Sequence, residues 1–132
     1  TQDRMQYHPV GVGNGYVLTF GDVQVYVAGD TEPNDDMLAL TDIDVAFLPM
    51  NLPFTMTAEQ AAAGVAEMKP RRAVPYHHRG TDPATFAAAL EAAGVTFVHC
   101  PLGTPIGITA RPPDAPRPAA RTTRPARAGK PD

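Results

Sequence analysis

The sequence contains no serine and no tryptophan, and Cys100 is its only cysteine. The absence of serine excludes the serine hydrolases and every Ser-His-Asp triad. A single cysteine cannot form a disulfide within the chain, so the fold depends on packing or on a bound metal ion. No apolar run approaches the roughly 18 residues of a membrane span. Residues 1–6 hold no signal-like apolar stretch, so we expect a cytoplasmic location unless a signal peptide precedes them.

The composition is typical of one small globular domain, with 132 residues, 43% of them hydrophobic and 19% charged. The net charge of −3 gives no reason to expect a nucleic acid or a membrane as a partner. The charge is uneven, however. Residues 1–103 carry five basic and 12 acidic side chains, whereas residues 104–132 carry six basic side chains, two acidic ones and seven of the 15 prolines. We therefore expect a domain over residues 1–103 and a disordered, basic, proline-rich tail over residues 104–132.

The first 103 residues alternate between strand and helix patterns. The expected strands are 16–20, 23–28, 43–48 (ended by Pro49), 73–76 and 95–98. A short helix is expected over 34–40. A second helix opens with the capping box of Thr57 and Gln60 and ends before Pro70. A third is capped by Asp82 and stopped by Gly94. This order predicts an α/β domain with its helices packed on one face of the sheet.

Polar side chains follow three of the expected strands at the point where each ends. Asp30 follows the second strand, Asn51 the third, and His77 and His78 the fourth. Ligands of open α/β sheets bind beyond the carboxyl ends of the strands. A lone aspartate after a strand is more often a turn or cap residue. Carboxylate and imidazole groups delivered together to one edge, in contrast, favour a site for Zn²⁺ or a related ion.

Several stretches in the same order resemble the C-terminal half of the metallo-β-lactamase-fold hydrolases. They are Tyr7-His8-Pro9 through Gly15-Tyr16-Val17, Gly29-Asp30-Thr31, the run from Ile43 to Pro53, Thr55-Met56-Thr57, and Pro75-Tyr76-His77-His78-Arg79-Gly80. The resemblance covers about residues 1–103 and is strongest to the bacterial branch with ascorbate-phosphate lactonase-like proteins. It implies that this chain forms one half of an αββα sandwich, with the inner face of its sheet left exposed to water.

The resemblance also implies a chemistry. Asp30 matches the aspartate that bridges two metal ions, and His77 matches the final histidine ligand. His78 is assigned to the pocket wall. The expected cofactor is a divalent metal, Zn²⁺ first, with Mn²⁺ or Fe²⁺ as alternatives, in a binuclear site. A metal-activated water would then hydrolyse a lactone, ester or phosphodiester bond of a small-molecule substrate.

The chain departs from the family pattern at the loop that supplies most ligands. It contains no H-x-H-x-D-H string, and its only histidines are His8, His77, His78 and His99. We therefore expect an incomplete enzyme, inactive alone, whose partner is a missing N-terminal half or a second copy. His8 is either an extra ligand or pocket residue, or a surface histidine. Asn51 either donates to substrate or caps its loop.

Two other hypotheses for the function of the chain remain open. The chain is a non-catalytic fragment or subunit that completes another chain along its exposed sheet edge, or it is an interaction module that uses the basic residues between Arg111 and Lys130.

Overall fold

The computed structural model describes residues 7–9, 12–101, 103–109 and 112. Within them the chain forms five strands and three helices. The strands are β1 (Tyr16–Phe20), β2 (Val23–Val27), β3 (Val45–Pro49), β4 (Arg72–Tyr76) and β5 (Thr96–Phe97); the helices are α1 (Asp35–Leu38), α2 (Ala58–Met68) and α3 (Pro83–Ala92). The predicted disorder of the tail falls mostly on residues outside this description.

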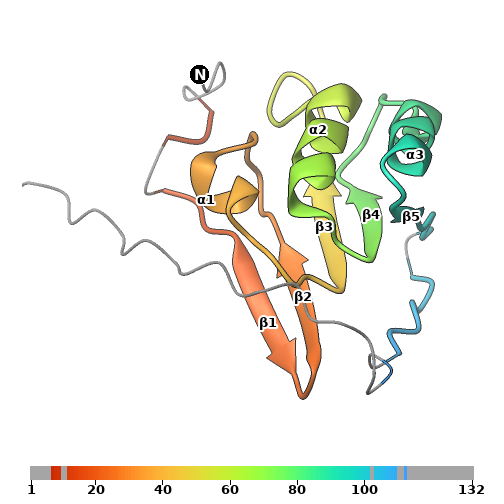
Figure 1. Cartoon of the computed structure of the whole chain (residues 1–132). Helices are drawn as coiled ribbons and strands as arrows, with labels where there is room; N and C mark the ends of the chain where they lie inside the picture. The colour runs from red at the N-terminus through yellow and green to blue at the C-terminus, as the bar shows by residue number, and fades with distance from the viewer. Residues whose placement is uncertain (1–6, 10–11, 102, 110–111, 113–132) are drawn as a thin grey trace, which may run out of the picture.

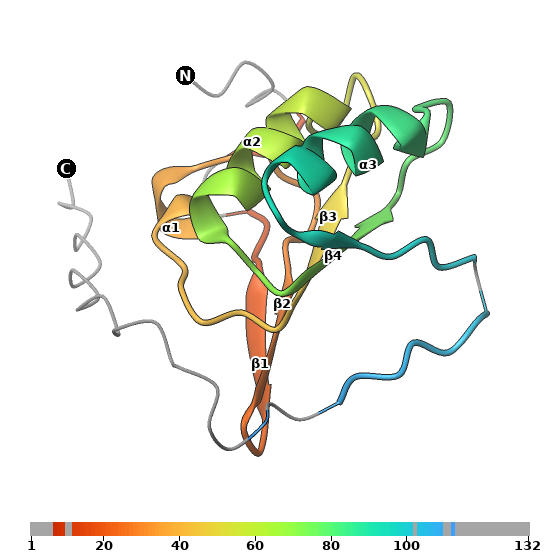
Figure 2. The same ribbon diagram turned by 45° about the vertical axis from the view of Figure 1, so that its right-hand side comes forward.

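The strands form one mixed sheet in the order β1-β2-β3-β4-β5. β1 and β2 form an antiparallel hairpin, and β2 through β5 run parallel. The helices lie on one face of the sheet, where α2 and α3 pack side by side (Figures 1 and 2). The predicted α/β architecture is therefore confirmed. Because β2, β3 and β4 are parallel neighbours, their carboxyl ends meet at one edge.

The helix boundaries follow from local capping. Thr57 accepts a hydrogen bond from the backbone of Gln60, and the Gln60 side chain accepts one from the backbone of Thr57, which is the predicted capping box. Asp82 caps α3 through the amide of Ala84. Asn34 caps α1 instead of belonging to it, so this helix is shorter than predicted. Pro49 is the last residue of β3 and not a stop beyond it, since it pairs with Tyr76 of β4.

The hydrophobic core lies between the helices and the sheet. Many of its most completely buried members come from β3, β4, α1, α2 and α3; they include Ala46, Leu48, Ala73, Met37, Val65, Phe86 and Leu90. The ring of Phe86 in α3 meets that of Phe97 in β5 edge to face, with centroids 6.2 Å apart. None of the helices in the described part of the chain has the length and apolar character to span a bilayer.

The opposite face of the sheet carries none of the three described helices (Figures 1 and 2). On it, Tyr16, Leu18 and Phe20 of β1 are 57%, 43% and 64% exposed. Towards the middle of the sheet, in contrast, Val45 and Val74 are buried. The expected water-exposed inner face is thus present at the β1 edge and absent at the centre.

Candidate metal centre

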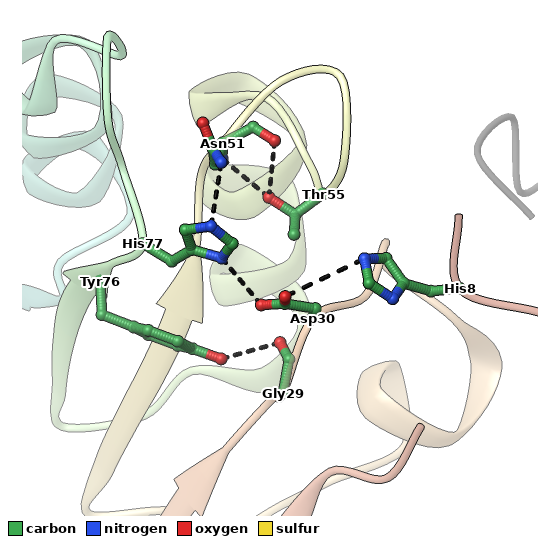
Figure 3. Close-up of polar contacts among 7 residues, drawn as sticks. All are labelled: His8, Gly29, Asp30, Asn51, Thr55, Tyr76 and His77. Carbon is green, nitrogen blue, oxygen red and sulfur yellow. Dashed lines mark hydrogen bonds and ion pairs between the residues drawn. The ribbon is translucent and has the colours of Figure 1, made fainter. Parts of the chain in front are cut away.

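The carboxyl ends of β2, β3 and β4 bring Asp30, Asn51 and His77 together (Figure 3). Gly29 has φ +69°, a conformation that suits glycine, and it turns the chain so that Asp30 points across the edge. His77 Nδ1 lies 2.9 Å from Asp30 Oδ1. His77 itself has φ +44°, which is uncommon for a residue with a side chain and typical of functional sites. The structure therefore brings Asp30 and His77 together at this edge of the sheet, as the sequence predicts.

Asn51 extends the contact into a chain of three polar side chains. Its Nδ2 lies 2.9 Å from His77 Nε2. An ionised carboxylate only accepts hydrogen bonds and an amide NH₂ only donates them. His77 therefore carries its proton on Nδ1, donates it to Asp30, and accepts from Asn51 at Nε2. With 37% and 39% of their side chains exposed, His77 and Asp30 are both open to an incoming ion.

The Asn51 loop is held by Thr55, which sequence reasoning missed as a site residue. The backbone N–H of Asn51 donates to Thr55 Oγ1 at 2.7 Å, and the backbone N–H of Thr55 donates to the backbone carbonyl of Asn51 at 2.9 Å. Thr55 is fully buried. The loop is thus fixed through the Asn51 backbone, which leaves the Asn51 side chain free to reach His77. Neither sequence alternative for Asn51 included this partner.

Tyr76 is a second residue that sequence reasoning missed. Its hydroxyl donates to the carbonyl of Gly29 at 2.8 Å and so ties the end of β4 to the turn that carries Asp30 (Figure 3). Burial, and then the negative charge of Asp30, raise the pKa of Tyr76 to about 12. The phenol therefore remains a hydrogen-bond donor at neutral pH. Its position directly before His77 is the feature of the sequence that could have indicated its role.

His8 and His78 have different positions. His8 Nε2 lies 4.0 Å from Asp30 Oδ2, beyond hydrogen-bond range. His8 and Asp30 both line a cavity of about 470 Å³. His78 is not among the residues that line this cavity, and within the described part of the chain no hydrogen bond joins its side chain to the cluster. Its assignment to the pocket wall stays a prediction, whereas His8 does lie in a pocket.

The donor set fits part of a metal site. With Zn–N and Zn–O distances of about 2.0–2.1 Å, two ligand atoms of one tetrahedral zinc ion lie roughly 3.3 Å apart. Asp30 Oδ1 and His77 Nδ1, 2.9 Å apart, reach this separation with a small movement once an ion replaces the proton that joins them. Among the described residues, however, no group of three or more His, Cys, Asp or Glu side chains is placed to hold an ion. Asp30 and His77 therefore fit two positions of a site and do not complete it.

From the raised pKa values of Tyr26 and Tyr76 we predict a loss of stability at alkaline pH. Burial raises the pKa of both Tyr26 and Tyr76 from 10.0 to about 12. In the unfolded chain these phenols ionise at about pH 10, so between about pH 10 and 12 the unfolded state binds fewer protons than the folded state. Stability is fully present below this interval and falls as the pH rises through it. Urea midpoints across the interval measure the effect; Tyr26→Phe should reduce the slope, and a constant midpoint would contradict the prediction.

Comparison with known proteins identifies the class of the fold. A UPF0173 metal-dependent hydrolase of Pyrococcus horikoshii is 39% identical over 80 residues, which are 58% of this chain and 36% of that protein. A solved structure from Parabacteroides distasonis is 43% identical with a TM-score of 0.70, and the match covers 74% of this chain and 44% of the other. The metallo-β-lactamase-fold protein YhfI of Bacillus subtilis, 16% identical, shares the fold with a TM-score of 0.58 over 70% of this chain and 43% of its own. The fold is therefore of the metallo-β-lactamase type.

The family follows from a more specific match. Residues 5–78 match the model of the β-lactamase superfamily domain, and the chain belongs to this family. The match includes Asp30 and His77 and ends just beyond them. The chain spans less than half the length of the relatives named above.

Proposed function

We propose that this chain provides part of the active site of a metal-dependent hydrolase. The observation that carries the proposal is the contact of 2.9 Å between Asp30 and His77 at the carboxyl edge of the sheet. The names of the relatives support hydrolysis by a metal-dependent enzyme. The proposed metal is divalent, Zn²⁺ first and Mn²⁺ or Fe²⁺ as alternatives, in a binuclear site. The proposed substrate is a small molecule with a lactone, ester or phosphodiester bond.

Each polar side chain has a proposed role. Asp30 and His77 hold the metal, and His8, 4.0 Å from Asp30, is a further donor within a short movement. Asn51 orients the His77 ring through Nε2, and Tyr76 fixes the Asp30 turn. When bound, the metal would lower the pKa of a water molecule and polarise the scissile bond. Because two or three donors are fewer than a stable binuclear site needs, we propose that the other ligands come from outside the described residues, from an N-terminal segment or a second copy.

A titration with Mn²⁺ tests the metal site on the chain as it exists. This paramagnetic ion broadens the NMR signals of groups near it even when binding is weak. We expect selective broadening of Asp30, His77 and His8 at low Mn²⁺ concentration. Broadening at the exposed acidic residues Asp35 and Asp36, with His77 unaffected, would contradict the proposal.

Hydrolysis is tested by complementation. The chain is co-expressed with the part of the Parabacteroides distasonis protein that lies outside the aligned 44%. Metal content and turnover of a lactone, an ester and a phosphodiester are then compared with those of either piece alone. We expect both to rise only when the two pieces are together. Equal turnover by the chain alone would show that no further ligands are needed.

A further inference from the structure

A cavity lies between β2, α1 and the loop that precedes β1, on the side of Asp30 away from His77. Its volume of about 470 Å³ is within the range of small-molecule sites. The lining residues on which the argument rests are His8, Asn14, Gly15, Tyr26, Asp30 and Asp36. Asp30 belongs both to this cavity and to the candidate metal centre. A molecule in the cavity would therefore lie directly beside the proposed metal ligands.

Tyr26 contributes a hydroxyl that has no hydrogen-bond partner among the described residues. The residue is only 5% exposed, and its hydroxyl makes no hydrogen bond with the described residues, unlike that of Tyr76, which donates to Gly29. The space beside the hydroxyl depends on Gly15, because a Cβ there would lie 3.2 Å from the phenol oxygen. Burial and the charge of Asp36 raise the pKa of Tyr26 to about 12, so the phenol keeps its proton. A hydroxyl donor that lines a cavity and has no partner among the described residues favours a ligand that offers an oxygen acceptor.

The charges around the cavity restrict the ligand further. Two carboxylates line it, those of Asp30 and Asp36, and the described lining contains no lysine or arginine. Besides His8 and Tyr26, its other polar side chains are the uncharged ones of Asn14, Thr31 and Asn34. An anion would meet two like charges with no cation to offset them. A neutral hydroxylated group, or one that carries an amine, meets no such repulsion.

We propose that this cavity binds a hydroxylated, non-anionic part of the substrate, with an amine preferred. Tyr26 donates to a ligand oxygen, and Asp36 faces the amine or hydroxyl side. The inference rests on the proposed hydrolase function, for which it names the class of substrate. The proposal predicts that the cleaved bond joins two parts of the substrate. One is the hydroxylated, non-anionic part in the cavity, and the other is the part that lies at Asp30.

Three sugars of similar size and different charge provide the probes: glucosamine, glucose and glucuronate. Each is titrated into the full chain, without added metal, while the backbone amide signals are followed by NMR. We expect shifts at Asn14, Gly15 and Tyr26, with glucosamine bound most tightly, glucose next and glucuronate least. Tyr26→Phe, which keeps the ring, should weaken glucosamine and glucose alike by about fivefold.

Asp36→Asn should weaken glucosamine and leave glucose nearly unchanged. Asp35→Asn is the matched control, because it removes the same charge from the same short helix at a residue that does not line the cavity. It should leave the order and the affinities unchanged. Circular dichroism of each variant verifies the fold.

The inference is overturned if glucuronate binds as tightly as glucosamine, if no probe binds, or if Tyr26→Phe has no effect on any of them. The metal titration above is a separate readout. Probe binding in the expected order without Mn²⁺ broadening at His77 would overturn the metal function and leave the pocket. Broadening at His77 without probe binding would overturn the pocket proposal and leave the metal function.

Discussion

Replacing Asp30 by asparagine is expected to weaken Mn²⁺ or Zn²⁺ binding at least about 100-fold. Loss of a residue that only supports a metal ligand costs about 10- to 100-fold in affinity, and loss of a ligand itself should cost at least the upper value. Asparagine has the shape of aspartate and lacks its charge. Its side-chain oxygen still accepts the proton of His77 Nδ1, so the contact of 2.9 Å can persist. Asp30 is 39% exposed, and we expect the free energy of unfolding to change by less than about 1 kcal/mol. The variant thus separates metal binding from folding.

Metal binding is measured by the Mn²⁺ titration and by metal content of the complemented protein. Asp35→Asn, at an exposed residue of α1, is the control for the loss of one negative charge. If Asp30→Asn and Asp35→Asn bind metal equally well, Asp30 is not a ligand. If Asp30→Asn instead retains full hydrolysis in the complemented protein with half the metal, its proposed bridging role is wrong.

Most of the features that sequence reasoning predicted correctly depend on residues close together in the sequence. The β1–β2 hairpin and the capping box of Thr57 and Gln60 are formed by side chains and turns a few positions apart. The convergence of Asp30 and His77 was also predictable. It requires only that parallel strands deliver their carboxyl ends to one edge, whatever the details of packing.

The features that were missed depend on contacts between distant residues. Tyr76 and Gly29 are 47 positions apart, and Asn51 and His77 are 26 apart. A pattern of residue types does not specify which acceptor a tyrosine or an asparagine reaches, because that depends on how the strands and loops are placed. The cavity beside Tyr26 has the same origin. It arises from the position of a four-residue helix, α1, whose length was itself predicted too long.

Replacing Gly29 by alanine is expected to destabilise the fold by about 2–4 kcal/mol. The backbone at Gly29 has φ +69°, which costs alanine about 1–2 kcal/mol. A Cβ at this position would also lie 2.6 Å from the carbonyl oxygen of Asn14. Because that oxygen belongs to the backbone, either the Asn14 segment or the Asp30 turn must move. The shift should also disturb the contact of Asp30 with His77 and the hydrogen bond from Tyr76 to Gly29.

Gly21→Ala is the matched control for this variant. Gly21 has φ +59°, and a Cβ there would meet nothing within 4 Å. Its cost should therefore be the conformational part alone, about 1–2 kcal/mol. Urea unfolding of both variants gives the two free energies, and their difference measures the contact with Asn14. We expect Gly29→Ala, and not Gly21→Ala, to weaken the Mn²⁺ broadening at His77. Equal losses of stability in the two variants would mean that the Asn14 segment yields freely, so that the turn before Asp30 is not held by its neighbours and the position of the carboxylate depends on Tyr76 alone.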